Sequence, residues 1–472
     1  VGGQLGEAAI STSLKAGAIG LALVCIFMMV VYLLPGVVAA ISLLLYTVLT
    51  LVTLNAFDIT LTLPGIAGII LGIGMAVDAN VIIYARIREE IAAGKSVKSA
   101  IDIGFKKALS AILDGNITTL IAAIVLGIMG TGSVKGFAYT LAMSIILSMF
   151  SALVISRYLA KAFYALGFQD VKYYGCPKKH NTIDFLKHKK VFFAIAIVCM
   201  ISGPVAMLIH SQGSGKALNY SLEFMGGTST NVTFNEDYSI EEIDEKVKPV
   251  VQEVTDDANI QATKVSGSNQ VIIKTRELSL DERTELSQKL NEKFGVDEST
   301  ITAESISSTV SNEMRQDAIV AVIIAAICML IYIWLRFKDI RFGASAVLAL
   351  LHDVLIVLAF YAIARISVGN TFIACMLTII GYSINASIVI FDRIRENLGS
   401  SKKHSDEALK EIVNRSITQT LTRSIYTSLT TFITIAALFI LGVPSIREFA
   451  APLIVGIVAG AFSSVCISGP LW

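Results

Sequence analysis

Eleven long apolar stretches are the feature that most constrains how this chain of 472 residues folds. A helix that crosses a bilayer needs about 20 mostly apolar residues. Charged residues make up only 16% of the chain, whereas soluble domains carry about 25%. We therefore predict an α-helical polytopic membrane protein. The expected transmembrane helices are at residues 16–34, 37–55, 63–85, 111–130, 137–158, 191–209, 317–335, 342–364, 369–391, 424–441 and 449–470.

The Lys and Arg residues indicate the orientation of these helices. They gather in four connecting segments, 86–110, 157–190, 336–341 and 393–423. Positively charged loops stay in the cytoplasm, so the polar stretch 210–316 is expected on the outer side. Net charge is +1, and a nucleic-acid-binding role is not expected because such domains carry a basic excess. No Cys or His spacing predicts a metal site, and the pair Cys176 and His180 is a weak candidate.

The polar stretch 210–316 has the pattern of a small α+β module. Alternating residues predict strands, and two amphipathic segments that begin with Ser predict helices. The resulting order, βαββαβ, is that of a ferredoxin-like domain. The expected strands are 228–234, 260–265, 270–275 and 300–305, the expected helices are 239–254 and 279–294, and a turn is expected at 266–269.

The two membrane parts of the sequence repeat each other. Gly74–Glu89 aligns without gaps with Gly381–Glu396, and both segments end in Arg-Ile-Arg-Glu. Because both copies run towards the cytoplasm, we predict two parallel pseudo-repeats. The first shows five helices and the second six, so a first helix and an external domain are expected upstream of Val1. The predicted divisions are 1–165 (first membrane half), 166–190 (cytoplasmic linker), 191–209 (first helix of the second half), 210–316 (external module) and 317–472 (five further helices).

Several motifs resemble the SecD and SecF protein-export family in its fused, SecDF form. The SecD-like runs are Leu63–Gly68, Gly74–Asn80 with its Val-Asp-Ala-Asn, and Asp114–Thr119; the SecF-like runs are Glu223–Thr228, Trp334–Phe337, Leu351–Val354 and Gly381–Asn385. The resemblance covers essentially the whole chain. It implies a membrane fold of the resistance-nodulation-division superfamily.

The resemblance also implies a function. Members of the family assist late-stage protein export in the bacterial inner or plasma membrane, and draw on the proton-motive force. The implied partners are the SecYEG translocon, YajC- or YidC-type insertase partners, the unfolded exported polypeptide and the lipid bilayer. Protons are the only coupling ion expected, no cofactor or metal is implied, and the chain is not expected to be an enzyme.

Two ionisable residues are the main candidates for proton relay. Asp78 lies inside an apolar stretch, where a carboxylate costs about 2.5–3.5 kcal/mol and is usually functional. The resemblance matches it to the proton-relay Asp of SecD; the alternative is a structural Asp bonded to Asn80, Thr118 or backbone. Arg423 matches a functional Arg of SecF; by position alone it is an interface arginine that reaches out to the headgroups.

The second half departs from the family pattern at one position. SecF usually has an Asp after the Asn of Gly-Tyr-Ser-Ile-Asn, but here Ala386 follows Asn385. Asp353, beside His352, is a further relay candidate, and a hydrogen bond between helices is an equal alternative. Asn80, Asp114, Asn116 and Asn385 are expected as supporting polar residues, with helix–helix bonding favoured for Asp114 and Asn116.

Two other functions compete with proton-driven export. A lipid or drug exporter of the same superfamily would need large external domains in both halves. A scaffold that only binds the translocon or an insertase, without transport, is favoured by Ala386.

Overall fold

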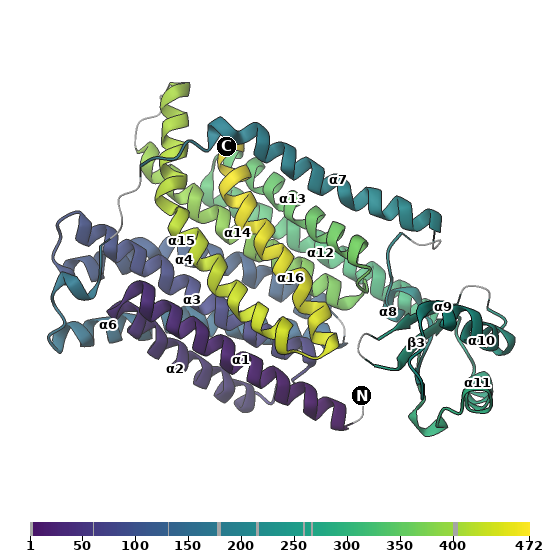
Figure 1. The fold of residues 1–472 in the computed structure, drawn as a ribbon. Coiled ribbons are helices and arrows are strands. Elements are labelled where there is room, and N and C mark those ends of the chain that lie inside the picture. The colour runs from purple at the N-terminus through teal and green to yellow at the C-terminus, as the bar shows by residue number, and fades with distance from the viewer. Residues whose placement is uncertain are drawn as a thin grey trace. The chain divides into compact units, whose positions relative to one another are not determined.

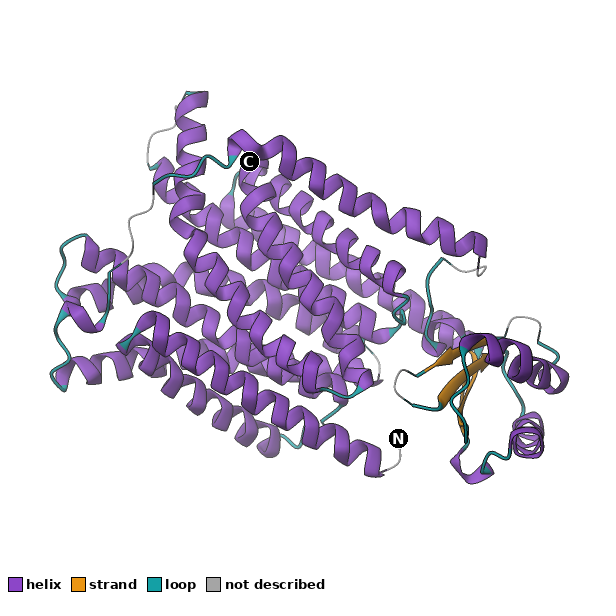
Figure 2. Ribbon diagram, in the orientation of Figure 1, coloured by secondary structure: helices purple, strands orange, loops and turns teal. Residues whose placement is uncertain are grey.

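The computed structural model describes residues 3–59, 61–130, 132–176, 181–213, 217–257, 260–265, 268–399 and 405–472. Within these ranges, eleven helices are long and apolar enough to cross a membrane, which confirms the predicted helical membrane fold. Helix dominates the chain, and the strands form one small sheet (Figure 2).

The membrane-type helices are listed here with the bounds used below. They are α1 (Gly3–Tyr32), α2 (Leu34–Ala56), α3 (Leu63–Ala92), α4 (Val97–Met129), α5 (Gly132–Phe150), which continues through a π-helical turn (Ser151–Ile155) into α6 (Ser156–Ala165), α7 (Lys189–Gly213), α12 (Ser308–Phe337), α13 (Ile340–Ala364), α14 (Asn370–Leu398), α15 (Asp406–Leu441) and α16 (Pro444–Ser463), which continues through a π-helical turn (Ser464–Ser468) into α17 (Gly469–Leu471). Short 3-10 turns occur at Val171–Tyr173, Leu186–His188 and Glu298–Thr300.

The chain divides into two compact units. The helical unit comprises residues 1–218, 321–366 and 371–472, and the small unit comprises residues 219–320 and 367–370. In the helical unit, α1 packs against α2 and α7 packs against α13 (Figure 1). The most apolar stretches of α3 and α14 are 94% and 89% buried, compared with 17% for the stretch that contains α7. These two helices therefore form the centre of the unit.

Several helices begin well before the apolar stretches that predict them, and the difference is largest for α4 and α15. α4 begins at Val97 rather than near residue 111, and α15 begins at Asp406 rather than near 424. Each has a serine N-cap, because Ser96 accepts from the Ser99 N–H and Ser405 accepts from the Ala408 N–H. Hydropathy marks only the apolar part of a helix, so the polar extensions were missed.

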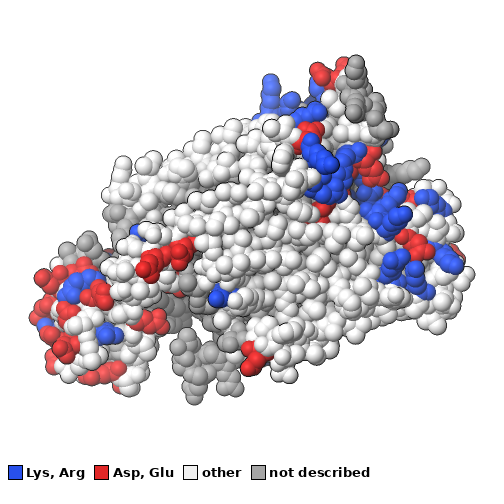
Figure 3. Space-filling model, turned by 180° about the vertical axis from the view of Figure 1, so that it is seen from behind, with Lys and Arg blue, Asp and Glu red and all other residues white. Residues whose placement is uncertain are grey.

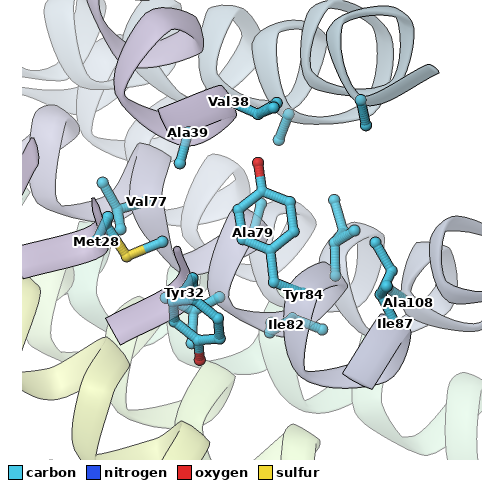
Figure 4. Packing of buried hydrophobic residues seen from close by; sticks show 14 of the residues in the cluster. Met28, Tyr32, Val38, Ala39, Val77, Ala79, Ile82, Tyr84, Ile87 and Ala108 are labelled. Atoms are coloured by element: carbon cyan, nitrogen blue, oxygen red, sulfur yellow. The ribbon is translucent and has the colours of Figure 1, made fainter. Parts of the chain in front are cut away.

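The helical unit has an aliphatic and aromatic core around α3. Met28, Val38, Val77 and Tyr84 are at most 1% exposed and belong to one cluster, which Figure 4 shows at the junction of several helices. The Tyr84 hydroxyl lies 2.9 Å from the Ser156 hydroxyl, so the buried phenol group has a hydrogen-bond partner. This packing holds α3 in place beside α2 and α6.

The surface of the helical unit is mostly uncharged on the face in Figure 3, and its Lys and Arg side chains gather at one end. Large apolar side chains such as Val30, Ile128 and Leu208 are 64–75% exposed. Such a broad apolar surface suits contact with lipid rather than water.

The small unit is built on a four-stranded antiparallel sheet with the order β2-β3-β1-β4. Its elements follow the predicted order of strands and helices; the ferredoxin-like classification and the pseudo-repeats of the helical unit stay predictions. Of the expected turn 266–269, residues 266 and 267 lie outside the described ranges. The elements are α8 (Leu222–Met225), β1 (Gly227–Thr233), α9 (Ile240–Glu242), a π-helical turn (Ile243–Val247), α10 (Lys248–Thr255), β2 (Gln261–Lys264), β3 (Gln270–Thr275), α11 (Leu280–Phe294) and β4 (Thr302–Ile306).

Both helical segments of the small unit begin with a capping box. Ser239 and Glu242 satisfy each other's backbone N–H groups, and Ser279 and Glu282 do the same for α11. A hydrogen bond from Arg276, at 2.5 Å, lowers the pKa of Glu282 to about 2. These local signals explain why the helices begin where the sequence predicts.

Gly227 offers a test of this unit. Its φ is +108°, and a Cβ there would lie 2.2 Å from the Thr275 carbonyl oxygen. We expect Gly227→Ala to destabilise the unit by about 1–3 kcal/mol, seen as faster amide hydrogen exchange in β1 and β3 of the full chain. Gly343→Ala in α13, where a Cβ meets no other atom within 4 Å, is the control and should leave that exchange unchanged.

Candidate functional site

Asp78 on α3 lies in the interior of the helical unit. Its side chain is buried, and Oδ1 has no hydrogen-bond partner within the described ranges. The Thr430 hydroxyl on α15 faces the carboxyl group. Asp78 lines a cavity of about 10 Å³ between α3, α14 and α15, which is room for about one water molecule. A buried carboxyl group with a free oxygen beside such a cavity can exchange a proton with water.

Arg423 lines the same cavity from α15. It lies in the middle of its helix and is only 5% exposed, so its side chain is enclosed by the protein rather than extended outward as the interface alternative expects. Its Nε has no hydrogen-bond partner in the part of the chain that the structure describes. Among the charged groups nearest to it are Arg393, Arg86 and Glu89. The cavity therefore holds one acidic and one basic side chain.

Asn385 on α14 lies between this cavity and a second one. The second cavity, also about 10 Å³, is lined by Asp78, Asn385 and, from α4, Asn116. A Cβ on Gly115 would lie 1.9 Å from Asn385 Oδ1, so Asn385 fills the space that a side chain at residue 115 would need. The structure thus brings Asp78, Arg423, Asn116 and Asn385 together, whereas Ala386 offers no titratable group.

The helices that carry the site approach each other closely at two matching places. A Cβ on Gly74 of α3 would lie 2.8 Å from the Thr431 Cα of α15, and a Cβ on Gly381 of α14 would lie 2.9 Å from the Thr119 Cα of α4. Gly74 corresponds to Gly381 in the alignment of the two halves, and a second match, of Asn116–Leu120 with Ser428–Phe432, pairs Thr119 with Thr431. Small residues at both contacts let the helix backbones approach.

Four charged side chains join the ends of α3 and α14. Arg86 binds Glu396 at 3.0 Å, and Arg393 binds Glu89 at 2.6 Å. Within each helix, Arg86 also binds Glu89 at 3.2 Å, and Arg393 Nε lies 3.8 Å from Glu396. Both arginines are buried. We call these four residues the charge ring; in the sequence its arginines count only as part of basic connections that indicate orientation, and their pairing is not predicted.

Asp114 does not line either cavity. It lies on α4 and accepts hydrogen bonds from Tyr332 at 2.7 Å and from Arg336 Nε at 2.7 Å, both on α12. Arg336 also donates to Ser110. The helix–helix bonding predicted for Asp114 therefore has named partners, which the sequence did not identify.

Asp353 lies in a separate cluster. One carboxylate oxygen is 2.9 Å from His352 Nδ1, and the other accepts hydrogen bonds from Ser383 on α14 and Ser463 on α16. The contacts fit the predicted alternative of a hydrogen bond between helices. Asn80, the remaining candidate, is buried on α3; its Oδ1 has no hydrogen-bond partner among the described residues, and it lines neither cavity.

A metal centre has no basis in the described residues, among which no group of three His, Cys, Asp or Glu side chains could hold an ion. Of the weak candidate pair, Cys176 is exposed, and His180 lies outside the described ranges.

The fold and the site together define a polytopic membrane protein with ionisable side chains at the centre of its helices. A family model described as protein export membrane protein SecD/SecF, C-terminal, matches residues 1–165 and 286–472. The chain belongs to this family.

The relatives and solved structures that match agree with one another. Over the whole chain it is 36% identical to the protein translocase subunit SecDF of Bacillus subtilis and 34% identical to that of Brucella abortus, and it covers 65% and 61% of them. A crystal structure of SecDF, titled a translocon-associated membrane protein, from Thermus thermophilus matches all of the chain with a TM-score of 0.86 and 33% identity. The chain covers 63% of that structure. It therefore spans less than two thirds of the length of these relatives.

The charge ring predicts a non-additive effect on stability. With Glu89→Gln or Glu396→Gln alone, each arginine keeps one carboxylate neighbour, and we expect a loss of about 1 kcal/mol. With both changes the two buried arginines have none, so the loss should exceed the sum by about 1–3 kcal/mol. Thermal unfolding of the purified chain in detergent measures this.

An exposed ion pair serves as the control. Asp102 lies 2.8 Å from Lys161, and both side chains are 46% exposed. Asp102→Asn should cost less than about 1 kcal/mol. Additive losses for the two glutamate changes would contradict a shared ring.

Proposed function

We propose that the chain is an auxiliary component of bacterial protein export that uses proton movement to promote late-stage translocation. The observation that carries this proposal is the cavity that Asp78 and Arg423 share between α3, α14 and α15. Family membership supports the export role, since relatives are named protein translocase subunits. The proposed partners are the SecYEG translocon, YajC- or YidC-type insertase partners and the unfolded exported polypeptide.

Protonation of Asp78 changes how α3 and α15 interact. In the charged form the Asp78 carboxylate and the Arg423 guanidinium line one cavity with opposite charges, in a site with little water where charge interactions are strong. In the neutral form the negative charge on Asp78 is gone, and the charged groups that act on Arg423 are Arg86 and Arg393, which repel it, and Glu89, which attracts it. Each proton that binds or leaves therefore favours a different packing of the two helices, which is what a proton-driven conformational cycle requires.

Asp78 has no second carboxyl group to share this work in the cavities. Among the residues that line them it is the only Asp or Glu. Ala386 lines the first cavity at the position where SecF usually has an Asp. Proton coupling in this proposal depends on Asp78, while the His352–Asp353 pair is a second, separate proton-exchange candidate.

The absence of the second carboxyl group is the observation that favours the competing function. In a scaffold that binds the translocon without moving protons, Asp78 would only hold helices together. Measuring proton uptake separates the two functions.

Asp78→Asn is the direct test. The amide keeps the size of the side chain and much of its hydrogen bonding but cannot take up a proton. We expect proton uptake by proteoliposomes containing the full chain, and export stimulation that depends on the proton gradient, to fall to background. The melting temperature in detergent should stay equal or rise, because an amide is cheaper to bury than a carboxylate.

Ala386→Asp complements this test. A second carboxyl group beside the cavity should shift the pH dependence of uptake, because two titrating groups would then interact. Full uptake by Asp78→Asn would show that Asp78 is structural and would favour the scaffold.

We also propose that the small unit lies outside the cell membrane, because the basic connections lie on the cytoplasmic side. In a cysteine-free background, a cysteine at the exposed Glu292 should react with an impermeant thiol reagent added to intact cells. A cysteine at the exposed Lys410 should react only after the cells are opened. The opposite labelling pattern would overturn the topology and the export role.

A further inference from the structure

The segment that opens the small unit is bonded to the residues just before α14. The Val368 N–H donates to the Asn219 carbonyl at 2.7 Å, and the Ser221 N–H donates to the Val368 carbonyl at 2.9 Å. Tyr220 and Val368 form a parallel β-bridge. Residues 367–370, although far along the chain, therefore belong to the small unit.

Glu223 extends this contact to the end of the helix. Its Oε2 accepts a hydrogen bond at 2.9 Å from the backbone N–H of Asn370, the first residue of α14. The first N–H groups of a helix have no partner within the helix, and negative charge is favoured there. A Cβ on Gly369 would lie 2.2 Å from Ser221 Oγ, so the absence of a side chain lets the two segments meet.

α14 runs without interruption from this contact to the candidate site. It spans Asn370–Leu398, and Asn385 lies 15 residues after its start, about 22 Å along the axis. Asn385 and Ala386 line the cavity with Asp78, and Arg393 of the charge ring follows two turns later. One element thus carries both a residue bonded to Glu223 and residues beside Asp78.

We propose that Glu223 is a positioning residue that couples the small unit to proton exchange. By accepting the hydrogen bond of the first N–H of α14, it sets the position of Asn385 and Ala386 against Asp78. A rearrangement of the small unit that moves Glu223 then shifts α14. Because coupling is reciprocal, a shift of α14 beside Asp78 also moves Glu223 and alters the small unit. This role of Glu223 rests on the proposed function, because it presumes that Asp78 exchanges protons.

Disulfide crosslinking tests the positioning directly. The parent is the full chain with its native cysteines replaced and with the pair Ala386→Cys and Thr427→Cys, two positions that line the same cavity. We expect Glu223→Ala to slow oxidative crosslinking about fivefold, as for loss of a helix N-cap. Glu223→Asp, which keeps the charge, should restore most of the rate.

The matched control is Glu285→Ala on α11, an exposed glutamate, which should leave the rate unchanged. If Glu223→Ala yields no folded protein, Glu223→Gln takes its place and should slow crosslinking about twofold, because its amide oxygen is a weaker acceptor. An unchanged rate in a folded Glu223 variant overturns the proposal.

Crosslinking is measured without a proton gradient, so it stands apart from the test of Asp78. Suppose that the Glu223 variants change the crosslinking rate as expected, but that Asp78→Asn takes up protons normally. Glu223 would then still be a positioning residue, and the proton-driven function would be excluded. Proton uptake is measured in the chain without the two introduced cysteines, which keeps Ala386 and Thr427. There, Glu223→Ala should also shift the pH profile of proton uptake, and Glu223→Asp should restore it. A profile that Glu223→Ala leaves unmoved contradicts the coupling.

Discussion

The burial of Asp78 and Arg423 between α3, α14 and α15 is the constraint on which the helical unit depends. An ionisable group inside a bilayer is stable only when protein or water surrounds it rather than lipid. α3 and α14 meet this condition by lying at the centre, with the other helices around them. Small residues at Gly74 and Gly381 allow the close helix contacts, and the charge ring joins the two central helices at their ends. The helices that surround α3 and α14 thus both enclose the polar interior and form the apolar exterior.

Much of the fold could be predicted because each membrane helix must satisfy the requirement of length and apolarity by itself. The helices of the small unit were equally accessible, since Ser239 and Ser279 begin them through contacts only three residues apart. Arg336 could not be assigned to Asp114 in the same way. The two are 222 residues apart, and their pairing depends on how α12 packs against α4. The burial of Arg423 could not be predicted either, because hydropathy does not identify the polar first part of α15 as part of the helix.

Only those parts of the candidate site could be predicted that are recognisable from one residue and its neighbours in the sequence. An Asp in an apolar helix stands out wherever its partners lie, so Asp78 could be found. The role of Asn385 as the side chain between two cavities depends on Gly115 of another helix. The charge ring was missed for a related reason: Arg-Ile-Arg-Glu at the end of a membrane helix has the composition of an ordinary interface anchor. Its reciprocal pairing is a property of two helices together.

The charge ring also bears on the order in which the chain is made. Arg86 is synthesised 310 residues before its partner Glu396, and Glu89 is synthesised 304 residues before Arg393. Until α14 is inserted, Arg86 and Glu89 have only each other as charged partners within the ring, so the ring is incomplete. Because the two halves are covalently linked, each first half is accompanied by one second half, which is present at high effective concentration. Fusion of the two halves into one chain therefore keeps the groups that complete the charge ring on the same molecule.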